Sequence, residues 1–281
     1  MKTMKKILIP TDFSACAKTA ETYGMELAKQ IKAELVFLHI IITPVNWSKL
    51  TKEQENLFPE TKENISKAKK ELNTLLEMAE KSGVKATKLL VFNSGNEKIQ
   101  KFIESEKIDI VVMGSHGQYG FKEHMLGTNT YSVLRRAEIP VIVVKKDNVK
   151  TAVKNLIFAT NFKEETGSSF SQIEKLAEEL GAKLHILFVN TPTYFMETND
   201  ILSVGQSYLN EFGNYNYDIT IIDAFKEERG ILQFAEKLDA DGIAVITFGK
   251  SDLMQYFSPS ITENLIAMSE LPVISIRKSK K

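Results

Sequence analysis

The sequence predicts an α/β protein of two tandem Rossmann-like domains, each a five-stranded, mainly parallel sheet of order 3-2-1-4-5 flanked by helices. Three observations support this prediction: short aliphatic runs alternate with helical periods, the same order of segments recurs in the second half, and a glycine-rich loop follows the fourth run. A length of 281 residues suits about two domains. We place them at residues 1–148 and 149–281, with the boundary in the polar stretch 145–150.

The strands of the first half are expected where short runs of β-branched and aliphatic residues occur. Runs that are apolar on both faces and separated by helices are typical of a parallel sheet covered on each side. The expected strands are 6–10, 35–40, 88–92, 108–114 and 141–144.

Helical periods fill the gaps between these strands. Apolar side chains recur at helical spacing between residues 20 and 31, and Ser14 precedes them as an expected N-cap. A second helix, over residues 65–79, is expected to stop at Gly83. A third is expected to open at Gly127 and to end before Pro140, with Leu134 on its inner face.

The second half repeats the first. I-L-I-P-T-D-F-S at 7–14 matches L-I-F-A-T-N-F-K at 156–163, and the same offset of 149 pairs 34–41 with 183–190. Near the end, E-I-P-V-I-V-V at 138–144 matches E-L-P-V-I-S-I at 270–276 at an offset of 132. Three matches in one order indicate a duplication, with an expected helix at 168–180 that ends at Gly181.

Two similar domains in one chain are expected to pack about a pseudo-two-fold axis, like the subunits of a dimer. The last strands of the two halves, 141–144 and 273–276, are apolar edge strands that would pair across this axis. The sequence leaves a homodimer of the whole chain open.

Charge and composition argue against several partners. The 36 basic residues balance the 36 acidic ones, so neither nucleic acid nor a membrane surface is an expected partner. Apolar runs are too short for a signal peptide or a membrane span, and one cysteine, Cys16, excludes an internal disulfide. These features lead us to expect a cytoplasmic protein.

The loop after the fourth strand carries four of the 14 glycines within residues 114–127. Its spacing is Gly114, two residues, Gly117, nine residues, Gly127 and then Thr128. Glycine permits close backbone approach to a ligand, and a helix N-terminus favours an anion. Thr128 and Thr130 add uncharged hydroxyl donors. The loop is therefore a predicted phosphate site.

The strand order makes strands one and four neighbours at the point where their connections diverge, which is where open α/β sheets bind ligands. Asp12, at the end of strand one, is a candidate acceptor for a base or ribose, a candidate metal ligand through water, or a local helix cap. Ile40, at the end of strand two, is a candidate apolar wall for a base.

These residues resemble the universal stress protein family, in particular its tandem-domain members. The resemblance rests on P-T-D-F-S at 10–14, on G-S-H-G at 114–117 followed nine residues later by G-T, and on I-P-V-I-V-V at 139–144. The full glycine spacing is the mark of the ATP-binding subgroup, so the resemblance implies ATP as the cofactor, with Mg²⁺ carried on its phosphates. The implied contacts lie near Thr11, Asp12, Ile40 and Gly114 for adenine and ribose, and at Gly117, Gly127, Thr128 and Asn129 for the phosphates. Further candidate cofactor-binding residues are Pro10, Met113, His116 and Thr130.

The second half departs from that pattern. Asn161 stands for Asp12, Asp252 for Gly117, and Pro259-Ser260 for Gly127-Thr128, in a loop taken as three residues shorter. An aspartate repels phosphate and a proline removes one N–H donor. We therefore expect a vestigial site, and a pairing and stabilising role for residues 149–281.

The sequence predicts a regulatory ATP-binding stress-response protein and not an enzyme. No nucleophilic triad or zinc spacing recurs, and Arg135 and Arg136 lie at the far end of their helix, so at most very slow ATP hydrolysis is expected. The alternative is an interaction module that binds no nucleotide and whose loops are relics. Cys16 is either a packed small residue or an oxidant sensor, and Trp47 either covers a nucleotide or anchors a loop.

Overall fold

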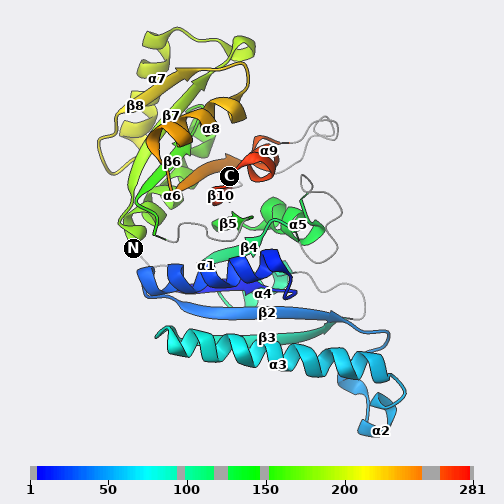
Figure 1. The fold of residues 1–281 in the computed structure, drawn as a ribbon. Helices are drawn as coiled ribbons and strands as arrows, with labels where there is room; N and C mark the ends of the chain where they lie inside the picture. The colour runs from blue at the N-terminus through cyan, green and yellow to red at the C-terminus, as the bar shows by residue number, and fades with distance from the viewer. Residues whose placement is uncertain (1–4, 94–98, 117–125, 146–151, 249–259, 279–281) are drawn as a thin grey trace.

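The computed structural model describes residues 5–93, 99–116, 126–145, 152–248 and 260–278. It confirms the α/β fold: ten strands form one sheet with helices on both of its faces (Figure 1). The strands are β1 (Lys6–Pro10), β2 (Glu34–Ile42), β3 (Ala86–Asn93), β4 (Ile110–Gly114), β5 (Val141–Val144), β6 (Asn155–Ala159), β7 (Lys183–Asn190), β8 (Ile219–Asp223), β9 (Gly242–Thr247) and β10 (Val273–Arg277).

The helices separate successive strands, as the alternating pattern predicts. They are α1 (Ala15–Ile31), α2 (Lys52–Glu55), α3 (Pro59–Lys81), α4 (Ile99–Ser105), α5 (Thr128–Arg136), α6 (Gly167–Leu180), α7 (Thr198–Phe212), α8 (Glu227–Leu238) and α9 (Ile261–Met268), with short 3-10 turns at Trp47–Lys49, Glu164–Thr166 and Pro192–Tyr194. The expected helix start and ends are confirmed. The Ser14 hydroxyl caps α1 by accepting from Ala17 N, and Gly83 and Gly181, after α3 and α6, have positive φ.

The sheet has the order β3-β2-β1-β4-β5-β10-β9-β6-β7-β8. The first five strands thus follow the predicted order 3-2-1-4-5, and the other five repeat it in reverse. Every pairing among the described strands is parallel except β5 with β10, which is antiparallel. The expected pairing of the two last strands is therefore confirmed.

The β5–β10 junction has the geometry of a two-fold contact. Ile142 lies directly opposite Ile274, and these residues are counterparts in the repeat. Val143 pairs with Val273, the counterpart of Val141, and Val141 pairs with Ser275, the counterpart of Val143, so the register is symmetric about the Ile142–Ile274 pair, as in an isologous interface. The two halves are thus joined as the subunits of a symmetric dimer are joined.

Polar contacts at helix C-termini reinforce this junction. The Lys145 ammonium, just after β5, donates to Ala267 O near the end of α9 at 2.6 Å. Its counterpart Arg277 donates to Arg136 O at the end of α5 at 3.5 Å. Cations suit helix C-termini because of the helix dipole, so each half stabilises the last helix of the other.

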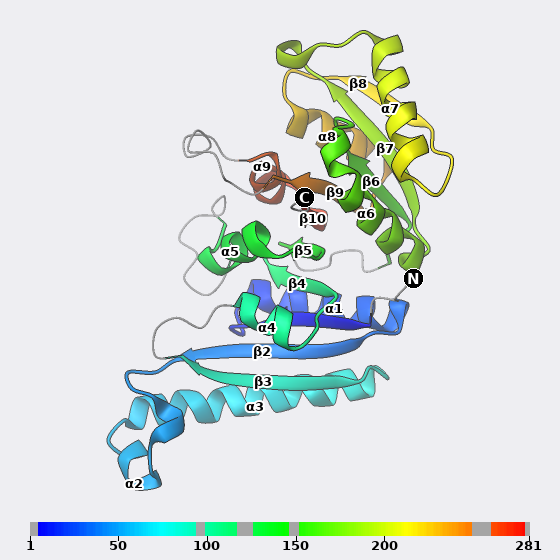
Figure 2. The ribbon, with the colours of Figure 1, turned by 180° about the vertical axis from the view of Figure 1, so that it is seen from behind.

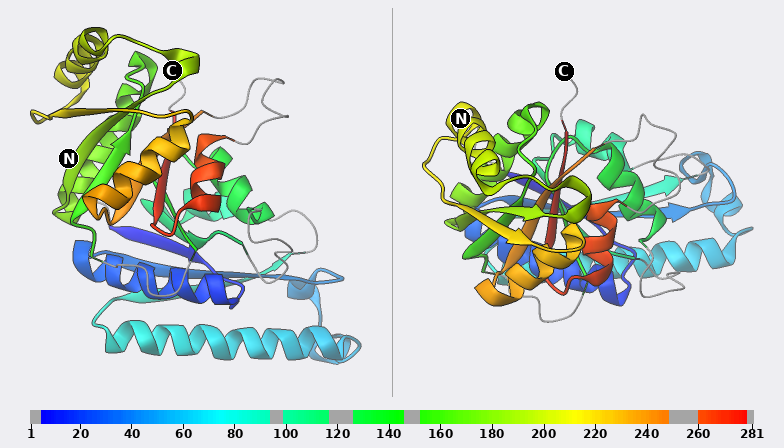
Figure 3. Two further views of the ribbon diagram at one scale, coloured as in Figure 1. Left: turned by 45° about the horizontal axis from the view of Figure 1, so that its top comes forward. Right: turned by 90° about the horizontal axis from the view of Figure 1, so that it is seen from above.

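Two hydrophobic clusters cover the two faces of the sheet and run through both halves. One contains apolar residues of α1, α3, α6 and α7, and the other contains those of α4, α5, α8 and α9. Figure 1 shows α1 in front of the first-half strands, and Figure 2, from behind, shows α4 in front of them. Figure 3 shows α8 and α9 next to each other. Each cluster is continuous across the two halves, so burial of its apolar surface stabilises both copies together.

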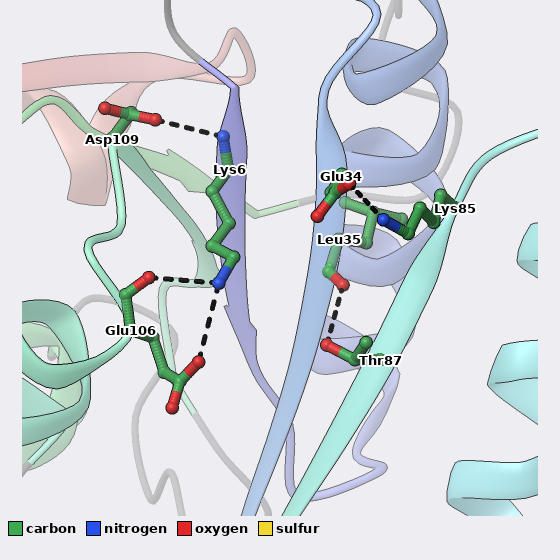
Figure 4. A network of polar contacts seen from close by, with 7 residues as sticks. All are labelled: Lys6, Glu34, Leu35, Lys85, Thr87, Glu106 and Asp109. Atoms are coloured by element: carbon green, nitrogen blue, oxygen red, sulfur yellow. Dashed lines mark hydrogen bonds and ion pairs between the residues drawn. The ribbon is translucent and has the colours of Figure 1, made fainter.

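An aspartate anchors the first strand of each copy at its amino end. Asp109 Oδ2 accepts from the backbone N–H of Lys5 at 2.9 Å and of Lys6 at 3.1 Å (Figure 4). Asp241 Oδ2 accepts in the same way from Lys154 N and Asn155 N, both at 2.9 Å. The repeat of this contact identifies it as part of the fold, at the end of the sheet opposite to the predicted site.

Trp47 anchors the long connection after β2. Its indole is buried in a small cluster with Ile41, Ile65 and Ala68, and its ring lies 6.5 Å from that of Phe92. The indole thus packs between the sheet and α3, so the structural alternative holds for Trp47.

Candidate functional site

The predicted site lies at the carboxyl ends of β1 and β4, which are neighbours in the sheet. Met113 is buried in the cluster beneath α4 and α5, and half-buried Ile40 packs against the same cluster. Ile40 lies within β2, since this strand continues to Ile42. Pro10 ends β1 and is half-buried. These side chains form an apolar floor beside the start of α5.

α5 begins at the same end of the sheet, because its N-cap residue bonds to Ser115, the residue after β4. Gly127 is the N-cap residue, with φ −63° and ψ 146°, and Thr128 and Asn129 are exposed. Within the described residues, no side chain caps this turn, and the turn contains no acidic residue. A helix N-terminus in this state is a suitable partner for an anion.

Gly127 N and Thr130 hold the loop in place from within. Gly127 N donates to Ser115 O at 2.9 Å, and the Thr130 hydroxyl donates to Gly114 O at 2.8 Å. Thr130 is buried, so its hydroxyl here ties α5 to the end of β4. The Gly127 N–H and the Thr130 hydroxyl, both predicted to contact phosphate, therefore already have partners within the protein. Gly117 lies outside the described residues.

Gly114 is required by packing. A Cβ at this position would lie 2.8 Å from Cys16 O and 2.9 Å from Cys16 C, in the first turn of α1. Because these are backbone atoms, they cannot move aside as a side chain would. The glycine allows β4 to end directly against α1, which brings the two sides of the site together.

His116 contacts Cys16, although 100 positions separate them. The Cys16 Sγ lies 3.4 Å from His116 Nε2, and Ser115 Oγ lies 2.9 Å from His116 Nδ1. Cys16 Sγ also donates to Lys145 O at 3.6 Å. The sequence motif placed His116 in the loop but held no signal for its contact with Cys16, because motif spacing describes neighbours along the chain.

Asp12 lies two residues beyond β1 and begins the turn into α1. Its Oδ1 accepts from Ser14 N at 3.1 Å, so the carboxylate supports the helix start, as one of the alternatives for this residue requires. Phe13 follows with a φ of 62°, a left-handed conformation that is uncommon for a residue with a side chain. This turn places the half-buried carboxylate of Asp12 at the site.

Glu21 and His39 contact the same turn and were not among the predicted site residues. The Thr11 hydroxyl donates to the buried Glu21 carboxylate and accepts from Phe13 N at 2.9 Å. His39 Nδ1 donates to Thr11 O at 2.7 Å. Burial raises the pKa of Glu21 and lowers the pKa of His39, because both positions disfavour charge.

The raised pKa of Glu21 predicts a pH-dependent stability. The folded protein binds the Glu21 proton more tightly than the unfolded chain does, so its stability should fall as the pH rises above the ordinary value of 4.5 and level off above the folded-state pKa. Glu21→Gln should flatten this slope in urea unfolding measured from pH 4.5 upwards. Glu26→Gln, at an exposed position of the same helix, should leave the slope unchanged. An unaltered slope in Glu21→Gln would contradict this assignment.

The corresponding helix of the second half, α9, caps itself. The Ser260 hydroxyl accepts from Glu263 N at 3.3 Å and donates to the Glu263 carboxylate at 3.2 Å. An acidic residue in the first turn and a side-chain cap satisfy the dipole and the amides that a phosphate would use. This finding agrees with the expected difference between the copies.

The strand registers correct part of the expected alignment. Gly114 pairs with Val144, and Ile246 pairs with Ile276 at the same place in the second copy, so Ile246 is the counterpart of Gly114. The offset of 132 then sets Gly249, and not Asp252, against Gly117, with loops of equal length. The prediction of a shorter loop in the second half was wrong, because it set Asp252 against Gly117 and so required a three-residue gap that the strand registers do not support. Asp252 and Pro259 lie outside the described residues.

Phe248 occupies the position that corresponds to His116. The ammonium groups of Lys163 and Lys278 lie 5.3 Å and 5.6 Å from the centre of its ring. Lys278 also pairs with Glu165 at 2.7 Å. At this place the second copy thus has an aromatic ring with two lysine ammonium groups near it.

The fold and the different first turns of α5 and α9 define a tandem α/β protein with one candidate anion site among the described residues. Residues 3–145 match the model of the Universal stress protein family, and the chain belongs to this family. It is 34% identical over 157 residues to Universal stress protein MJ0577 of Methanocaldococcus jannaschii, a match that covers 51% of this chain and 96% of the relative. Universal stress protein MJ0531 of the same organism is 34% identical over 151 residues, covering 50% of this chain and 82% of the relative.

A solved structure shares the whole architecture. The universal stress protein from Archaeoglobus fulgidus aligns over 99% of this chain and 100% of its own, with a TM-score of 0.76 and 22% identity. At this identity the likeness concerns the fold. In the part of the chain that the structure describes, no helix combines the length and apolarity that a bilayer span needs, and no three His, Cys, Asp or Glu side chains are arranged for a metal ion.

Proposed function

We propose that the first half binds an adenine nucleotide, ATP, at the carboxyl ends of β1 and β4, and that the protein acts as a nucleotide-dependent regulator in a stress response. The observation that carries the proposal is the first turn of α5, whose amides meet no side-chain cap among the described residues while the turn bears no acidic residue. Its counterpart α9 is capped by Ser260 and carries Glu263.

The side chains around this turn suit the parts of a nucleotide. Exposed Thr128 and Asn129 would donate main-chain N–H groups to phosphate oxygens, and an accompanying Mg²⁺ would balance phosphate charge. The Ile40 and Met113 side chains would contact the base, since both belong to the apolar floor next to the turn. Asp12 would accept a hydrogen bond from the ribose or the base.

We further propose that this site binds without rapid turnover. Phosphoryl transfer needs a group that neutralises developing charge, commonly an arginine, and a residue that orients the attacking water. Arg135 lies in the last turn of α5, where its guanidinium donates to the Tyr131 hydroxyl at 2.9 Å. ATP would then act by favouring the conformations that it binds best.

The second half would serve pairing and stability. Its last strand, β10, pairs with β5, and the Phe248 ring and the Ser260 cap stand where the first half has His116 and the start of α5, which has no side-chain cap among the described residues. In this proposal, the first half binds the nucleotide, the second half has a structural role, and the two halves share a continuous core.

The test is to look for nucleotide in the purified protein. We expect that acid denaturation releases an adenine nucleotide, and that ATP at about 100 times its Kd stabilises the protein by about 2.7 kcal/mol. This gain should raise Tm by roughly 5–10 °C. ADP, AMP and cyclic AMP in the same thermal scan would identify the preferred nucleotide. No released nucleotide and no shift with millimolar ATP would instead support an interaction module with relic loops.

A further inference from the structure

We propose that Glu21 and His39 are positioning residues that hold the Thr11–Phe13 turn from two sides, so that Asp12 is set in place for the ligand. This inference rests on the nucleotide site proposed above. Both residues act through the turn, and neither needs to contact the nucleotide.

Glu21 holds the turn through its side chain. The Thr11 hydroxyl accepts a hydrogen bond from Phe13 N at 2.9 Å and donates one to the Glu21 carboxylate. These two hydrogen bonds join α1 to the turn. Glu21 is only 5% exposed. A buried carboxyl group is costly to retain, and it is usually kept where its hydrogen bond is needed.

His39 holds the turn through its backbone. Its Nδ1 donates to Thr11 O at 2.7 Å, and its ring lies against that of Phe13 with centroids 4.6 Å apart. The imidazole thus fixes the carbonyl immediately before Asp12 and packs against the side chain immediately after it. The bond restricts rotation of the peptide group that joins Thr11 to Asp12.

The second copy shows that the fold itself does not require either residue. Phe162 has a φ of 56°, and its N–H donates to the Thr160 hydroxyl at 3.0 Å, so the same turn forms there. The positions of Glu21 and His39 are taken by Phe170 and Phe188, and the Phe188 ring stacks on that of Phe162 at 5.8 Å. Phe188 therefore packs against an equivalent turn that carries Asn161 and no predicted ligand, and Phe170 stacks on Phe158 of β6 with ring centroids 5.2 Å apart. Where the second copy has phenylalanines, the first copy has two polar contacts, from Glu21 and from His39, at the turn that carries Asp12.

Charged groups around the two residues come from several elements. Glu21 faces Asp12 from the turn, Lys18 from α1 and Glu71 from α3, and His39 faces Asp12. Burial raises the pKa of Glu21, the hydrogen bond from Thr11 and the charge of Lys18 lower it, and the negative charges of Glu71 and Asp12 raise it further. A protonated Glu21 is still an acceptor for the Thr11 hydroxyl, so the turn remains held in either state.

The first experiment measures the turn without any nucleotide. Amide hydrogen exchange of Phe13 and Ser14 should be about tenfold faster in His39→Phe and in Glu21→Leu than in the wild type, because both N–H groups bond within the turn. Exchange of Phe162 N, in the equivalent turn, is the internal reference. Unchanged exchange at Phe13 and Ser14 would overturn the proposal.

The second experiment measures ATP binding by calorimetry. His39→Phe and Glu21→Leu should each weaken ATP binding about five- to tenfold, which corresponds to one hydrogen bond. Glu21→Gln should restore near wild-type affinity, because an amide oxygen accepts the same hydroxyl. It should also remove any pH dependence that Glu21 gives to ATP affinity, an effect that a packing role would not produce. The matched control is Phe188→His in the second copy, which should leave ATP affinity unchanged.

The outcomes separate this inference from the proposed function. Wild-type protein that binds no ATP would refute the nucleotide site, and the positioning role with it. If the wild type binds ATP and both His39→Phe and Glu21→Leu bind it equally tightly, the positioning role alone would be overturned.

Discussion

Gly127→Asp is expected to weaken ATP binding by about 100-fold or more while the protein stays folded. Gly127 has extended backbone angles at the N-cap of α5, a conformation that suits aspartate. The new carboxylate would accept from the first-turn amides and repel phosphate from them. Loss of two charge-assisted hydrogen bonds at about 1.5 kcal/mol each corresponds to that factor. Calorimetric titration with ATP, together with a thermal scan without ligand, measures both effects.

Ser260→Asp is the matched control for this change. It adds the same charge at the N-cap of α9, where Ser260 already caps the helix. ATP affinity should stay at the wild-type value, since the second copy is not the binding site in our proposal. ATP binding by Gly127→Asp at wild-type affinity would show that the phosphates bind elsewhere.

Ile142→Asp is expected to have the largest effect on stability. Ile142 and its partner Ile274 are fully buried at the β5–β10 junction, within the core that both halves share. An unpaired charge there would cost about 4 kcal/mol or more. We expect a large shift of the urea unfolding midpoint and rapid cleavage between the halves in limited proteolysis.

Ile42→Asp is the control for that change, because Ile42 at the end of β2 is 82% exposed. It should shift the unfolding midpoint little. Equal stability of Ile142→Asp and the wild type would mean that the two halves do not depend on their shared sheet.

Much of the fold was predictable because it depends on local patterns. β1 and β5 coincide with the expected runs, and the other expected strands of the first half differ at their ends. The repeat predicted that β5 and β10 pair, since duplicated edge strands can cover each other symmetrically, and the structure shows this pairing to be antiparallel. The short helices α2 and α4 were not predicted, because a few turns of helix carry too little periodicity to stand out.

The candidate site was predicted less completely. The motif placed Asp12 and Gly127 at one end of the sheet, where the structure has them. It contained no indication of Glu21, His39 or the Cys16–His116 contact, because these join residues that are far apart in the chain. Thr130 was expected to face the ligand, whereas its buried hydroxyl donates to Gly114 O.

Periodicity and repetition along the chain were enough to predict the duplicated α/β plan and the glycine spacing of one copy, and the strand order 3-2-1-4-5 was expected from the Rossmann-like class. Only the tertiary structure decided that α5 begins without a side-chain cap within the described residues while α9 is closed by Ser260 and Glu263, and that Glu21 and His39 hold the turn before α1. The physical reason is that hydrogen bonds and buried charges depend on which side chains meet in space. Two copies with one backbone plan can therefore differ at the ends of their strands, where ligands bind.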